Sequence, residues 1–155
     1  MSEHFRYYLR VRYFECDAQK VVFNARYGDY IDLAATEYLR ALDLINMTTG
    51  EGLDFQVVKQ TTQWMAPARF DDVLELSVYA SHLGNTSFTL KTDIRIAGSD
   101  EIIVTAETVN VAFDHHTLSK KALSDEARAI MQKGGPGLIV DHAGYFPLDR
   151  SAKSA

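Results

Sequence analysis

One helical pattern, set between two groups of strand patterns, constrains the fold of this chain more than any other feature. Apolar residues between positions 27 and 42 recur at steps of three and four, the spacing of a helix with a broad apolar face. These residues are Tyr27, Ile31, Ala34, Ala35, Tyr38, Leu39 and Leu42. A helix with so much apolar surface must be covered, and a curved antiparallel sheet can wrap around it.

Strand patterns lie on both sides of this helix. From Phe5 to Tyr13, apolar residues alternate with Arg6, Arg10 and Arg12, which predicts a half-buried strand with its arginines on the opposite face. A solvated face is the favoured interpretation of these arginines, and an anion-binding face is the alternative. Four further strands are predicted at residues 55–64, 73–83, 87–96 and 102–113, with breaks at Gly50 and Gly52, at Pro67, at Gly84-Asn85 and at Gly98-Ser99-Asp100.

The end of the chain predicts one more helix and then a tail. Ser124 can cap a helix over residues 125–133, and Gly134 can end it. The order of elements is one strand, one long helix, four strands and a short helix, which is an α+β arrangement. We expect a single domain over residues 1–148 and a frayed tail over residues 149–155. A sheet of about five strands also has edges, which a second copy of the chain can cover.

Composition and charge limit the partners and the cellular location that we expect. The 155 residues suit about one domain, and 16 basic against 21 acidic side chains give a net charge of −5, which disfavours nucleic acid. Cys16 has no second cysteine with which to form a disulfide. No run approaches the roughly 18 apolar residues of a membrane span, and the first ten residues lack the apolar core of a signal peptide. We therefore expect a cytoplasmic domain without a membrane span.

The segment between the first strand and the helix holds the best candidates for chemistry. Asp17 lies too far ahead of Asn24 to cap the helix, and Asn24 can be the cap itself. An acid near a helix start can be purely structural, because it interacts favourably with the helix dipole. Alternatively, Asp17 lies beside the free N–H groups of the first helical turn. Those donors could bind a developing oxyanion while the carboxylate attacks or activates water.

Other constellations are weaker. The sequence has no Gly-x-Ser-x-Gly elbow, no glycine-rich phosphate loop and no dinucleotide fingerprint. His115 and His116 are adjacent, whereas two ligands on one helical face need a spacing of four, so solvated histidines are favoured over a metal site. Cys16 is interpreted as a packed side chain in preference to a nucleophile. No metal is expected.

Several motifs together resemble a known family. They are Glu15-Cys-Asp17 with Val21-Val22-Phe23-Asn24 and Tyr27, the helical run Asp32-x-Ala34-x-Thr36-Glu37-x-Leu39-Arg40, the corner Ala66-Pro67-Ala68-Arg69-Phe70-Asp71-Asp72, the turn Gly84-Asn85-Thr86-Ser87-Phe88, and Ala106-Glu107. The chain resembles the hotdog-fold acyl-CoA thioesterases over residues 11–113. The nearest branch is that of the 4-hydroxybenzoyl-CoA thioesterases and the Tol-Pal-associated acyl-CoA thioesterases.

The resemblance implies a hotdog fold, with an antiparallel sheet of about five strands wrapped around the helix, in a homodimer or homotetramer with active sites between subunits. It implies hydrolysis of an acyl- or aroyl-CoA to the free acid and CoA. In that reaction Asp17 is the nucleophile or general base, and the backbone N–H at Asn24 is the oxyanion donor. Thr86 and Ser87 match a turn along the CoA arm, and Asp32 is either near the acyl group or a structural helix acid. No cofactor is implied, because CoA is part of the substrate.

Three positions depart from the family pattern. Lys20 stands where glycine is usual, Asn24 replaces a histidine seen in many relatives, and Arg26 replaces a small residue or asparagine. The turn at Gly84-Asn85-Thr86 lacks the basic cluster that some relatives use for CoA phosphates. The alternative function is a non-catalytic hotdog module that binds acyl-CoA or another acyl ligand, for which a carboxylate at Asp17 has no use. A hotdog dehydratase would need a histidine with an acid on the helix, and the predicted helix has no histidine.

Overall fold

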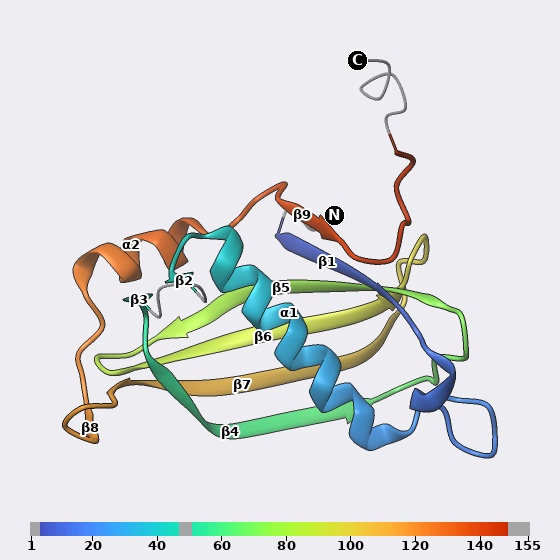
Figure 1. The fold of residues 1–155 in the computed structure, drawn as a ribbon, viewed down its shortest axis with the longest axis horizontal. Helices are drawn as coiled ribbons and strands as arrows, with labels where there is room; N and C mark the ends of the chain where they lie inside the picture. The colour runs from blue at the N-terminus through green and yellow to red at the C-terminus, as the bar shows by residue number, and fades with distance from the viewer. Residues whose placement is uncertain (1–3, 47–50, 149–155) are drawn as a thin grey trace.

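The computed structural model describes residues 4–46 and 51–148, and one long helix lies across one face of a curved sheet (Figure 1). The expected turn at Gly50 and the expected frayed tail lie outside the described residues. The helices are α1 (Tyr27–Ala41) and α2 (Asp125–Lys133), with 3-10 turns η1 (Tyr13–Glu15) and η2 (Asn24–Arg26). The strands are β1 (Phe5–Arg10), β2 (Ile45–Asn46), β3 (Glu51–Gly52), β4 (Phe55–Trp64), β5 (Val73–Leu83), β6 (Ser87–Ile96), β7 (Ile102–Asp114), β8 (Ser119–Lys120) and β9 (Ile139–Asp141).

The main sheet has the order β4-β7-β6-β5-β1-β9, with β8 paired to β7. The five long strands pair antiparallel, as expected, and their bounds follow the predicted ranges closely. The short strands β2, β3, β8 and β9 were not predicted, and β9 pairs with β1 in parallel. The sheet is therefore mixed, because a segment some 130 residues away in the chain returns to cover the β1 edge.

The core lies between α1 and the inner face of the sheet. Ala34, Tyr38 and Leu39 on α1 are fully buried, as are Leu74 and Leu76 on β5. The predicted apolar spacing of α1 thus corresponds to its buried face. The predicted second helix is also confirmed, since Ser124 Oγ accepts a hydrogen bond from the N–H of Ala127 at 3.0 Å and Gly134 ends the helix.

Tyr13 corrects the predicted first strand. The alternation places it with the buried residues Phe5 and Leu9, but its side chain is 81% exposed. The reason is that β1 ends at Arg10 and Tyr13 begins the 3-10 turn η1, so the period of two no longer applies. Tyr8, on the other face of β1, is instead buried by residues that follow β9.

The two edges of the sheet differ. At one edge, β9 covers β1, and Tyr145 stacks on Tyr8 with ring centroids 5.2 Å apart. At the other edge, β4 has no further strand beside it within the described residues. Val57, Val58 and Trp64 on β4 are all more than half exposed. The open edge of the sheet therefore carries three exposed apolar side chains among mostly polar ones.

Candidate active site

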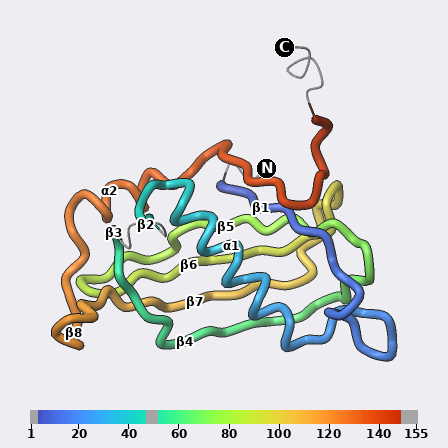
Figure 2. Tube along the Cα trace, in the orientation of Figure 1, coloured from blue at the N-terminus to red at the C-terminus, as the bar shows by residue number. Residues whose placement is uncertain are grey.

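The segment between β1 and α1 forms a small hairpin at one end of the sheet (Figure 2). Cys16 and Val22 form an isolated antiparallel β-bridge, and the N–H of Asp17 donates to the carbonyl of Val21 at 2.9 Å. The hairpin also joins the Pro67 corner through a bridge between Val21 and Arg69. At its tip, the N–H of Lys20 donates to the carbonyl of Asp17 at 2.9 Å. Backbone hydrogen bonds on both sides therefore hold the position of Asp17.

A buried carboxylate ties this hairpin to α1. Glu15 is 2% exposed, and its oxygens accept from the Arg12 backbone N–H at 2.7 Å, from the Arg12 guanidinium at 2.8 Å and from the Tyr30 hydroxyl at 2.9 Å. Burial raises the pKa of Glu15, but the hydrogen bonds from Arg12 and Tyr30 outweigh it and hold that pKa below its ordinary value. Burial and the neighbouring Glu15 carboxylate raise the pKa of Tyr30.

Asp17 itself is exposed at the hairpin tip. Its Oδ1 accepts from the backbone N–H of Gln19 at 2.8 Å, so one carboxylate oxygen is oriented by the turn. Among residues 4–46 and 51–148, no hydrogen bond joins this carboxylate to the start of the helix. The second oxygen is therefore available to a ligand.

Asn24 is not the predicted helix cap. It is the first residue of η2, the cap position belongs to Phe23, and no side-chain cap bond forms there. The expectation failed because a 3-10 turn precedes α1 and moves the helix start to Asn24 itself. In the described part of the chain, the N–H groups of Asn24 and Ala25 have no acceptor. They are the free donors that a helix start presents.

Asp17 and Asn24 lie on the same hairpin but not in contact. Asp17 pairs opposite Val21, and Asn24 follows three residues later, which corresponds to about 10 Å along extended chain. That length of chain is the largest separation of the two positions, and a thioester carbonyl placed between them lies within reach of both.

The remaining predicted residues lie elsewhere. Thr86 and Ser87 are at the turn between β5 and β6, at the far end of these strands from the hairpin (Figure 1). The ten residues of β6 separate the two ends by about 30 Å. Asp32 is exposed on α1, outside the buried face that the helix turns toward the core. One chain alone therefore does not bring Thr86 and Ser87 to Asp17.

The structure shows exposed aromatic residues that the sequence patterns did not mark as part of a surface. The Arg12 and Arg26 guanidinium carbons lie 5.1 and 5.5 Å from the ring centre of Phe14. Tyr13 meets Phe70 edge to face, with ring centroids 5.9 Å apart. Their exposure is the signal of a binding or contact surface, and no period in the sequence marks it, because η1 is a single irregular turn.

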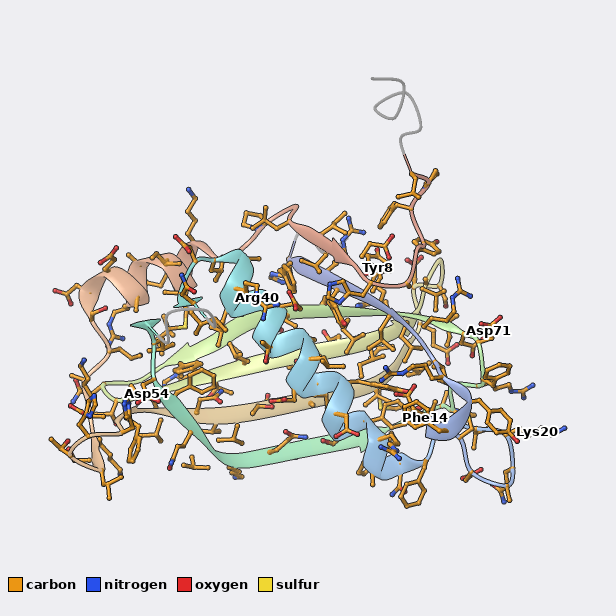
Figure 3. All side chains as sticks on the ribbon, in the orientation of Figure 1. Tyr8, Phe14, Lys20, Arg40, Asp54 and Asp71 are labelled. Atoms are coloured by element: carbon orange, nitrogen blue, oxygen red, sulfur yellow. The ribbon has the colours of Figure 1, made fainter. Side chains whose placement is uncertain are left out.

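The remaining candidates from the sequence, the Cys16 thiol and the two adjacent histidines, do not add a reactive group to this hairpin. Burial, followed by the neighbouring Glu15 and Asp17 carboxylates, raises the pKa of the Cys16 thiol, which disfavours the thiolate. His115 Nδ1 lies 2.6 Å from Asp54 Oδ2, at the opposite end of the sheet (Figure 3 labels Asp54). Within the described residues, no three His, Cys, Asp or Glu side chains are placed to hold a metal ion.

Comparison with solved structures identifies the class of fold. The structure titled gentisyl-coenzyme A thioesterase BH1999 aligns with a TM-score of 0.72 at 22% identity, over 81% of this chain and 98% of that one. The PA5185 protein of Pseudomonas aeruginosa aligns with a TM-score of 0.77 at 20% identity, over 86% and 92%. The fold is the predicted hotdog fold, with one sheet around one long helix.

Comparison of sequences identifies the family. A profile described as the thioesterase superfamily matches residues 19–103. The acyl-CoA thioester hydrolase YbgC of Escherichia coli O6:H1 is 32% identical over 120 residues, which cover 77% of this chain and 89% of that protein. The chain belongs to the thioesterase superfamily. Its described residues contain no helix long and apolar enough to cross a membrane.

Proposed function

We propose that this protein is an acyl-CoA thioesterase, which hydrolyses an acyl- or aroyl-CoA to the free acid and CoA. Membership of the thioesterase superfamily and the name of the Escherichia coli relative support the reaction class. The observation that carries the proposal in this chain is the hairpin. It holds an exposed carboxylate, Asp17, at the same end of the molecule as the free N–H groups of Asn24 and Ala25.

The proposed chemistry needs only these groups and water. The N–H of Asn24 donates to the thioester oxygen and stabilises the negative charge that develops on it. Asp17 either accepts a proton from the attacking water or attacks the carbonyl itself. The carbon–sulfur bond then breaks, the thiolate of CoA leaves and takes up a proton, and the acid is released. A nucleophilic Asp17 would add one step, hydrolysis of the resulting acyl anhydride by water.

We further propose that the working unit is a homodimer joined at β4, or an even assembly of such dimers. The two-fold arrangement that pairs one β4 antiparallel with another is supported by the open edge of the sheet and by the exposed Val57, Val58 and Trp64 on it. In that pairing, the start of one β4 lies beside the end of the other. The far end of one sheet, with Thr86 and Ser87, is thereby brought toward the hairpin of the partner. The proposed contact of these two residues with the CoA arm depends on that arrangement, and Asp32 stays a candidate for the acyl side.

The direct test is a panel of aryl-, short- and long-chain acyl-CoAs, with release of free thiol as the readout. Turnover of at least one class is the expected result. Saturable binding of an acyl-CoA without thiol release would instead support the non-catalytic module. The single domain over residues 1–148 and the cytoplasmic location expected from the sequence stay predictions.

A further inference from the structure

An open pocket of about 440 Å³ lies on the outer side of the Asp17 hairpin. It is lined by Gln19, Lys20, Val21, Arg69 and Phe70. Two of these five side chains are cations and none is a carboxylate. The pocket is formed by two segments that the bridge between Val21 and Arg69 joins, so its walls are fixed relative to one another. The lining itself is therefore basic in a chain with a net charge of −5, which favours an anion over a cation there.

The two cations are not used to hold the fold together. At this end of the molecule Arg10 pairs with Asp71, Arg12 with Glu15, and Arg26 with Asp29. Lys20 and Arg69 take part in none of the ion pairs found among the described residues. The nearby Asp72 carboxylate accepts from the backbone N–H of Arg69 and not from its guanidinium. Both cationic groups are therefore free for a ligand.

Lys20 occupies a position that its backbone does not favour. Its φ is +65°, in the left-handed region where glycine is at ease and a residue with a side chain costs about 1 kcal/mol. Figure 3 shows its side chain at the tip of the hairpin, pointing away from the body of the molecule. A lysine in a strained turn, whose side chain makes no ion pair among the described residues, is explained if its charge serves a ligand.

An aromatic surface adjoins the cations. Phe70 is 52% exposed on the pocket wall, and Tyr13, which is 81% exposed, meets it edge to face. Exposed aromatic rings stack on nucleobases, whereas Lys and Arg bind phosphate oxygens. The combination of two free cations with an aromatic wall matches a phosphorylated nucleotide better than a simple carboxylate.

We infer that this pocket binds the 3′-phosphorylated adenosine diphosphate part of CoA, with Lys20 and Arg69 on its phosphates and Phe70 beside its adenine. The inference rests on the proposed thioesterase function. The pantetheine arm separates the nucleotide from the thioester, so a subsite on the outer side of the hairpin leaves Asp17 free for the reaction. Lys20 and Arg69 are binding residues in this assignment and take no part in bond breaking.

The test measures binding and turnover separately. Adenosine 3′,5′-bisphosphate is titrated by calorimetry, and KM is measured for an acyl-CoA and for the matching S-acyl-pantetheine, which lacks the nucleotide. Lys20→Gly and Arg69→Gln should each weaken binding of the bisphosphate and raise KM for acyl-CoA by about tenfold, because each removes one charged contact. Neither should change KM for S-acyl-pantetheine or kcat for either substrate. Added salt should reduce the difference between wild type and variants.

Two controls isolate the charge. Lys20→Arg keeps it and should bind the bisphosphate nearly as wild type does. Lys120→Ala removes an exposed lysine from β8 and should change nothing. Because Lys20→Gly relieves the left-handed strain, its unfolding temperature should equal or exceed that of wild type, which separates lost binding from lost fold.

The inference and the proposed function fail in different ways. Unchanged bisphosphate affinity and unchanged KM in Lys20→Gly and Arg69→Gln, in an active enzyme, would overturn the subsite alone. A wild-type protein that binds the bisphosphate through these residues but releases no thiol from either substrate would overturn the thioesterase and support the subsite.

Discussion

The Tyr30 hydroxyl donates to Glu15 Oε1 at 2.9 Å, and through this bond the central helix holds the hairpin that presents Asp17. Both side chains are almost completely buried, and Arg12 supplies the remaining donors to the carboxylate. The site is therefore supported by an interaction between two residues that are fifteen positions apart and take no part in the proposed chemistry.

Loss of this support should be measurable as stability. Tyr30→Phe removes one donor from a buried carboxylate, so we expect the free energy of unfolding to fall by about 1.5–3 kcal/mol in denaturant titrations. Tyr13→Phe, at an exposed ring, should change it by less than about 0.5 kcal/mol. Equal effects of the two variants would show that the bond to Glu15 does not stabilise the fold.

The same carboxylate predicts a pH dependence. Because the folded-state pKa of Glu15 is held below the ordinary value of 4.5, its contribution to stability is present above that value. It is lost as the pH falls through the lowered folded value. Asp141 also has a lowered pKa: burial raises it, but hydrogen bonds from the N–H groups of the following segment outweigh that effect. Because Asp141 also titrates in this range, the quantity to measure is the difference in unfolding free energy between wild type and Glu15→Gln. We expect this difference in unfolding free energy to be large at pH 7 and to shrink steadily below pH 4.5, and a constant difference would contradict the assignment.

Asp17 is the residue on which the reaction depends most directly. Asp17→Asn keeps the size of the side chain and its acceptor for the N–H of Gln19, so the hairpin should survive. Thiol release should fall at least about 10²-fold, because the nucleophile or base is gone. Asp100→Asn, in a distant turn, is the matched control and should retain full turnover. Turnover of Asp17→Asn near that of the control would remove Asp17 from the mechanism.

The helix start can be tested with two substitutions at one position. Since the Asn24 side chain makes no cap bond, Asn24→Ala should change stability by less than about 0.5 kcal/mol and turnover only slightly. Asn24→Pro deletes the free N–H at a position where proline is tolerated, and should lower kcat by about 10²–10³-fold. Thermal unfolding of both variants checks the fold. If both fold and alanine is as damaging as proline, the side chain and not the backbone makes the contact.

The proposed dimer predicts a specific weak point. Val58 is 60% exposed on the open edge strand, and Val58→Lys would place like charges near the two-fold axis. We expect wild type to sediment as a dimer or a larger even assembly at micromolar concentration, and Val58→Lys to shift toward the monomer with loss of turnover. Leu148→Lys, at a side chain that is 73% exposed away from that edge, should leave the assembly unchanged. An active wild-type monomer would contradict the proposal.

The local elements of this protein could be predicted because their periods are present in neighbouring residues. The steps of three and four in α1, the alternation in β5 and β6, and the Ser124 cap each depend on a few adjacent side chains. The family resemblance over residues 11–113 added the hotdog fold and the thioesterase class, and both are confirmed.

The sequence by itself determined the two helices, the five long strands and their order, and tertiary structure decided where the candidate residues stand relative to one another. The exposure of Tyr13, the 3-10 turn at Asn24 and the left-handed backbone of Lys20 all belong to the segment that packs against the Pro67 corner. The pairing of β9 with β1 likewise joins distant parts of the chain. These features depend on contacts between residues far apart in sequence, and such contacts cannot be predicted from the pattern of neighbouring residues.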